Sequence, residues 1–93
     1  MPTAYATPPL VTADDWLELT LADCTMLSTI NNGPAAVMYR ASNTKPTEAA
    51  GHHEIAAGSG LDGLMTEVFR GVTAARVWAR TPAGFATVSF LAD

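Results

Sequence analysis

Two adjacent histidines beside a glutamate, His52, His53 and Glu54, are residue types that bind metal ions or transfer protons, and the chain has no other histidine. Successive side chains of a β-strand point to opposite faces, so in a strand only His52 and Glu54 share a face. A zinc site needs more protein ligands than such a pair supplies. We therefore predict no metal and no cofactor, with one histidine facing solvent and the other at a subunit contact.

The remaining nucleophiles and carboxylates give no catalytic arrangement. Cys24 lies in an alternating apolar stretch without a neighbouring base, where a cysteine usually serves as a small buried hydrophobe. Asp14 and Asp15 form a carboxylate pair just before a strand. The glycine-rich stretch 58–63 lacks the Lys-Ser/Thr pair of a phosphate-binding loop. We predict no catalytic residues and a protein that is not an enzyme.

The stretch RVWAR contributes three candidate partner contacts, Arg76, Trp78 and Arg80, which alternate with small apolar residues. Trp and Arg are enriched at interface hot spots, so an outward stripe of these residues would contact a protein or a sugar. The alternative is the opposite register. In that arrangement Trp78 is a core residue, and the arginine stems pack against its edges.

Residues 1–13 are expected to form an extended N-terminal arm. Pro2, Pro8 and Pro9 lack the N–H that a strand ladder requires, and each favours extended backbone in the residue before it. Such an arm becomes ordered on a partner. Pro8, Pro9 and Leu10 are therefore further candidate contacts.

Composition narrows the classes of partner. Charged residues make up 15% of the chain and hydrophobic residues 48%, whereas about 25% charged is usual. A surface this poor in charge suits contact with other subunits, so we expect a homo-oligomer. A net charge of −4 with five basic residues disfavours nucleic acid. The single cysteine suits a reducing cytosol, and neither a signal peptide nor a membrane span is expected.

The patterns predict a single all-β domain over residues 14–93. Apolar and polar residues alternate in short runs that turn signals separate. The expected strands are residues 16–21, 24–30, 35–41, 51–58, 65–69, 72–80 and 83–92. About seven short strands predict a small antiparallel β-sandwich, either jelly-roll-like or immunoglobulin-like.

Two connections in this domain carry expectations of their own. The sequence NNGP at residues 31–34 is expected to be a turn, because Asn and Gly tolerate positive φ. Apolar residues in 61–72 recur at helical spacing, but Gly63 and Gly71 oppose a helix. We expect a strand at 65–69, with a helical turn as the alternative.

The order of these features resembles small β-sandwich virion proteins of tailed bacteriophages. The resemblance covers residues 16–93: an opening strand region WLELTLADCTMLSTINNG, a middle region AAVMYRASNTKPTEAAG, and a closing pair ARVWARTPAGFATVSFLAD. It implies a structural subunit of a virion assembled in the bacterial cytoplasm. The foremost role is a capsid decoration or cement protein that binds the major capsid protein, or a head–tail accessory piece.

Two other interpretations remain open. One is a receptor- or carbohydrate-binding module of a phage fibre, which would expose an aromatic platform. The other is a cellular sandwich domain taken from a longer chain. Neither brings a catalytic residue with it.

Overall fold

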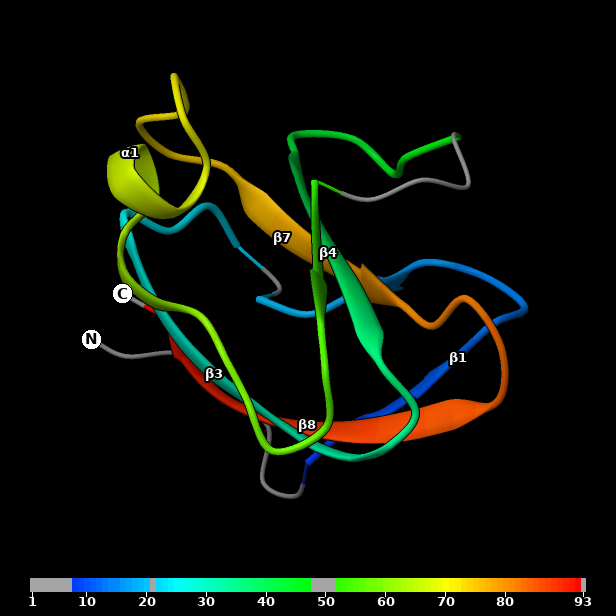
Figure 1. Cartoon of the computed structure of the whole chain (residues 1–93). Helices are drawn as coiled ribbons and strands as arrows, with labels where there is room; N and C mark the ends of the chain where they lie inside the picture. The colour runs from blue at the N-terminus through cyan, green and yellow to red at the C-terminus, as the bar shows by residue number, and fades with distance from the viewer. Residues whose placement is uncertain (1–7, 21, 48–51, 93) are drawn as a thin grey trace.

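Alternation of buried and outward-facing residues is the feature from which this fold is built. In β3 (Met26–Pro34) and β8 (Phe85–Ala92), every second side chain is buried. The computed structural model describes residues 8–20, 22–47 and 52–92, in which it has eight strands and one short helix (Figure 1). The others are β1 (Leu10–Thr12), β2 (Leu17–Glu18), β4 (Val37–Ser42), β5 (His53–Ile55), β6 (Asp62–Leu64), α1 (Met65–Val68) and β7 (Arg76–Arg80).

The strands pair in a nested order. The first sheet has the order β1-β8-β3-β6 and the second has β2-β7-β4-β5, with antiparallel neighbours throughout. This is the topology of a jelly roll, in which one long hairpin is rolled up. The paired strands of that hairpin are β1/β8, β2/β7, β3/β6 and β4/β5. Figure 1 shows β8 and β3 in one layer and β7 and β4 in the other. The prediction of an all-β antiparallel sandwich is confirmed, with eight strands and in its jelly-roll form.

The core lies between the two sheets. Val11 and Val88 enter it from the first sheet, and Val37 and Val77 from the second; all four are fully buried. Tyr39 is the largest fully buried side chain. Burial of each valine contributes about 1.5–3 kcal/mol relative to exposure, so these inward positions fix which face of each strand points inward.

The expected strand at residues 65–69 is wrong, because this segment is a helical turn. Met65 and Phe69 lie one turn apart and are both buried in the core, and the Phe69 N–H donates to the Met65 carbonyl at 2.8 Å. The two glycines that opposed a helix lie outside α1. Gly63 has φ +142° and Gly71 has φ +84°, so they shape the entry and exit of the chain and do not interrupt the turn.

A strand replaces part of the expected N-terminal arm. In β1, Leu10 lies opposite Thr87 and Thr12 lies opposite Phe85 of β8. The residue between them, Val11, is fully buried. β1 therefore belongs to the sandwich and not to an arm, while residues 1–7 of the predicted arm lie outside the described residues.

The expected turn at residues 31–34 is also wrong, because β3 continues through it. A bulge between Asn31 and Gly33 shifts the register against β8, and Gly33 has φ +79°. The Asn31 side chain holds the bulge: Oδ1 accepts from Gly33 N–H at 2.8 Å, and Nδ2 donates to the carbonyls of Ala35 and Ile55 at 2.9 Å each. Since Ile55 belongs to β5, these bonds also join the two sheets.

Candidate functional site

The predicted contact strand, β7, lies inside the second sheet between β2 and β4. Val77 and Ala79 are fully buried in the core. Arg76, Trp78 and Arg80 therefore face outward from the sheet. Of the two registers that the sequence allowed, the structure has the outward one.

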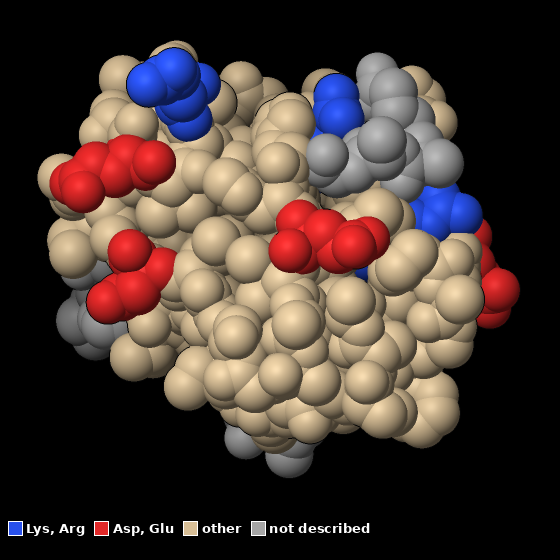
Figure 2. Space-filling model, in the orientation of Figure 1, with Lys and Arg blue, Asp and Glu red and all other residues tan. Residues whose placement is uncertain are grey.

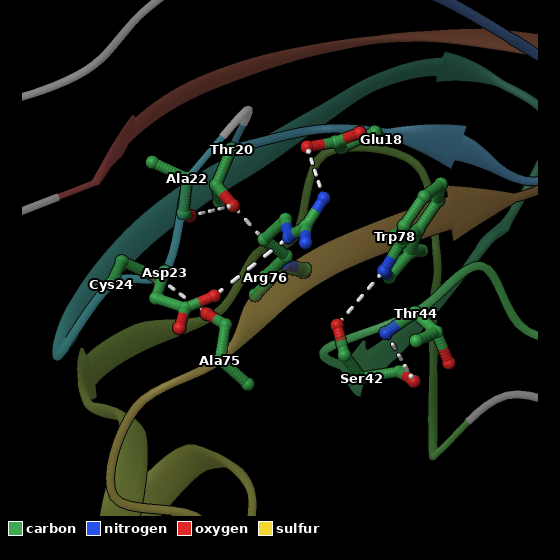
Figure 3. A network of polar contacts seen from close by, with 11 residues as sticks. Glu18, Thr20, Ala22, Asp23, Cys24, Ser42, Thr44, Ala75, Arg76 and Trp78 are labelled. Atoms are coloured by element: carbon green, nitrogen blue, oxygen red, sulfur yellow. Dashed lines mark hydrogen bonds and ion pairs between the residues drawn. The ribbon is translucent and has the colours of Figure 1, made fainter.

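Both arginines of this stripe are engaged within the chain. Arg76 Nη1 donates to Glu18 Oε1 at 3.3 Å, and Arg76 Nε lies 3.8 Å from Asp23 Oδ1 (Figure 3). Arg80 Nε donates to the Ala13 carbonyl at 3.0 Å. The two side chains tie the segments around β2 to β7, and their contact with a partner stays a prediction.

The tryptophans are covered. Trp78 faces outward but is only 6% exposed, and its indole Nε1 donates to the carbonyl of Ser42, at the end of β4, at 3.0 Å (Figure 3). Trp16 is 4% exposed. Neither residue offers an open indole face to a ligand.

The two histidines share a structural contact. Both rings meet the Phe69 ring edge-on, with centroid distances of 5.8 Å for His52 and 5.3 Å for His53. His53 Nε2 donates to the Val68 carbonyl, and His52 Nδ1 accepts from Ala41 N–H at 3.3 Å. The contacts with Phe69 and Val68 attach the start of β5 to the end of α1, and the bond from Ala41 attaches it to β4.

The remaining reactive groups show no activation. Cys24 is buried and its thiol donates to the Ala75 carbonyl at 3.5 Å; burial, and then the charge of Asp23, raise the pKa of this thiol, so the nucleophilic thiolate is disfavoured. Asp15 pairs with Lys45 at the surface, and this contact lowers the pKa of the Asp15 carboxyl. In residues 8–20, 22–47 and 52–92, no three His, Cys, Asp or Glu side chains gather to hold a metal ion.

The outward side of the first sheet carries large apolar side chains among small polar ones. Every large hydrophobic side chain that is exposed in the described part of the chain lies on it, between 44% and 56% exposed. We call these residues the apolar face: Leu10, Met26, Ile30, Leu64, Phe85 and Leu91. A sheet that faces water normally turns polar residues outward, and these six residues depart from that pattern.

Charge is distributed unequally between the two sheets. Outward strand positions of the second sheet carry Glu18, Arg40, Glu54, Arg76 and Arg80. Described outward positions of the first sheet carry one charged residue, Asp62, on its edge strand β6. Figure 2 agrees: the lower third of the view, where Figure 1 places β8, shows neither red nor blue atoms.

Small side chains leave a shallow hollow in the middle of the apolar face. Ile30 pairs with Ser89 and Ser28 pairs with Leu91, so the two serines and the two aliphatic residues form a checkerboard. The hollow there has a volume of about 210 Å³. Ser89 Oγ accepts a hydrogen bond from Asn32 Nδ2 at 3.0 Å, and this hydroxyl therefore keeps a partner when water leaves.

The residue pattern alone predicts this surface only in part. Of the predicted contacts, Leu10 lies on the apolar face, Pro8 is exposed, and Pro9 is half-buried with its carbonyl accepting from Val88 N–H at 3.3 Å. The low charge indicated a covered surface without placing it. The sequence signal that could have located this surface is the run 81–92, which contains no charged residue.

No family model, curated protein sequence or solved structure matches this chain. Among the described residues, no helix is long and apolar enough to cross a membrane. The two sheet faces themselves differ: large apolar side chains are exposed on the first, and charged side chains lie on the second.

Proposed function

We propose that this chain is a non-enzymatic structural subunit that assembles through the apolar face. Its proposed setting is a bacteriophage particle, in which it decorates the shell formed by the major capsid protein and stabilises it. A shell that carries such a subunit ruptures only when the added contacts break as well.

The observation that carries this proposal is the gathering of all exposed large hydrophobics of the described chain on one sheet. Exposed hydrophobic side chains scattered singly over a surface are normal. Here all six lie on one side of one sheet, and two of them, Met26 and Leu64, are direct cross-strand neighbours. At about 25 cal/mol per Å² of apolar surface removed from water, burying this face offers several kcal/mol to association.

The setting rests on the resemblance of residues 16–93 to phage virion proteins. The jelly-roll topology agrees with it, because such folds are common in viral capsid proteins, although the same fold also serves other functions. The buried Cys24 thiol needs no oxidising compartment.

A carbohydrate-binding module is the second candidate, and the structure gives it less support. Such modules stack sugars on exposed aromatic rings. Both tryptophans are nearly inaccessible, and Phe85 is the one large aromatic side chain exposed among the described residues. It lies on the apolar face, away from the charged side that would supply polar partners for sugar hydroxyls.

Mass spectrometry of purified phage particles tests the proposal. Particles released by bacteria that carry the gene should contain the chain at a fixed ratio to the major capsid protein. A lysine at the centre of the apolar face, Ile30→Lys, should lower this ratio, whereas Glu54→Lys on the outward side of the second sheet should not. The proposal fails if the wild-type chain is abundant in the cells and absent from their particles.

A further inference from the structure

We infer that a second copy of this chain covers the apolar face, so that the first sheets of two copies pack face to face into a four-layer stack. The inference rests on the apolar face of the proposed function but not on its setting. It makes a second copy the occupant of that face, so the major capsid protein would contact another side of the dimer. A dimer can form in solution whether or not the chain enters a phage particle.

Charge favours self-association through this face. A two-fold interface brings the same patch of both copies together. The outward positions of the second sheet carry charges of both signs, which would have to lose water on contact, whereas the apolar face carries only Asp62, on its edge strand, among its described positions. Two chains that each have a net charge of −4 associate most easily where neither presents charge.

The size of the face suits a dimer. Strands lie about 4.8 Å apart and rise about 3.3 Å per residue. The four strands, with nine residues in β3, eight in β8 and three each in β1 and β6, therefore span roughly 360 Å² in projection, before side-chain relief is added. Two such faces bury about 700 Å² in projection and more with side-chain relief, which suits a weak dimer at the low end of interface sizes.

The relief of the face is self-complementary. Ile30 and Leu91 project beside the hollow that Ser28 and Ser89 line. When two sheets pack about 10 Å apart, side chains of their facing sides interdigitate. The projecting aliphatic residues of one copy can thus enter the hollow of the other, and the second sheets remain outside with their charged residues in water.

Sedimentation velocity of the full chain over a wide range of concentrations tests this inference. The wild-type chain should sediment as a dimer that dissociates on dilution. Ile30→Lys should place a buried, unpaired charge in the interface and raise the dimer dissociation constant at least about a hundredfold, given the cost of unpaired buried charge. Glu54→Lys introduces the same side chain on an exposed strand position of the second sheet and should leave the dimer intact.

Leu91→Lys is the second variant of the face, and circular dichroism shows which variants remain folded. A wild-type chain that stays monomeric at every concentration overturns the inference. The inference is also overturned if Ile30→Lys and Leu91→Lys both remain folded and both still form the dimer. If deletion of residues 1–7 turns a monomeric wild type into a dimer, the N-terminal segment is the natural occupant of the face, and the second copy is not.

These outcomes are separable from those of the proposed function. A monomer in solution that is nonetheless present in phage particles would leave the function standing and remove the dimer. A dimer that never enters phage particles would leave the dimer standing and remove the proposed function.

Discussion

Asn31 is the buried polar residue on which the link between β3 and β5 depends. Its side chain makes three hydrogen bonds while being fully buried. Asn31→Ala should lower the free energy of unfolding by about 2–4 kcal/mol, since each buried group left without a partner costs about 1–3 kcal/mol. Urea denaturation measures this loss.

Asn32→Ala is the matched control for that experiment. Asn32 is exposed, and its side chain donates a hydrogen bond to Ser89, so its removal should cost well under about 1 kcal/mol. Equal losses for the two variants would contradict the special role of Asn31.

Tyr39 presents the opposite case, a buried hydroxyl without a hydrogen-bond partner among the described residues. Burial raises the pKa of this phenol, and the nearby Thr29 side chain opposes the rise. The Tyr39 hydroxyl and the Thr29 side chain do not meet the geometry of a hydrogen bond. Tyr39→Phe should leave stability unchanged or raise it by up to about 1 kcal/mol, because it removes an unsatisfied polar group. Tyr39→Ala should instead lose about 3–5 kcal/mol of packing. A marked loss in Tyr39→Phe, measured by the same denaturation, would show that the hydroxyl is bonded.

At the scale of elements, Gly60 fixes how closely the segment before β6 approaches β3. A Cβ atom at this position would lie 1.7 Å from the Thr29 carbonyl oxygen. Gly60→Ala should therefore unfold the protein or shift its melting temperature by far more than Gly71→Ala. Gly71 has φ +84° but open space around it, so only the backbone cost of about 1–2 kcal/mol applies there. Similar thermal shifts for the two variants would mean that the 58–61 segment moves freely away from β3.

Strand β1 can be tested by two truncations. Deleting residues 1–12 removes Val11 from the core and the partner of one side of β8, whereas deleting residues 1–7 keeps both. The longer truncation should be less stable than the shorter by at least about 2 kcal/mol, from the burial of Val11 alone. Chemical denaturation compares them, and equal stability would restore the interpretation of this segment as an arm.

The elements that the sequence predicted well are those whose pattern is local. Alternation over residues 83–92 and 35–41 places β8 and β4 within a few residues of their observed bounds. The β1 strand was missed because three prolines in thirteen residues outweighed a two-residue apolar signal at Leu10 and Val11. The α1 turn was only the alternative expectation because glycine was counted as an interior residue, although Gly63 and Gly71 lie outside it.

The apolar face marks the limit of prediction from the sequence. Leu10, Ile30, Leu64 and Phe85 come from four different strands, and their common exposure follows from the pairing of β1 and β6 with β8 and β3. Alternation in one strand shows that two faces exist but not which of them meets the other sheet. The position of the surface therefore needed the strand order as well as the strands.

At the scale of the whole molecule, the nested pairing makes most sheet contacts distant in sequence, with β1 paired to β8 across nearly the whole described chain. Folds dominated by such pairings fold slowly, in roughly milliseconds to seconds. We expect refolding from urea in this range, followed by tryptophan fluorescence, since Trp16 and Trp78 become buried. Refolding in microseconds would contradict the observed topology.

The nested order also bears on how the chain is made. β8 lies between β1 and β3 in the first sheet and is the last of the eight strands along the chain. Until β8 has left the ribosome, β1 has no strand to pair with. The sheet that buries the inward side chains of Val11 and Leu27 is then incomplete. The nascent polypeptide therefore carries exposed apolar segments until β8 has been synthesised. Chaperones that bind extended apolar segments would meet this protein before any partner does.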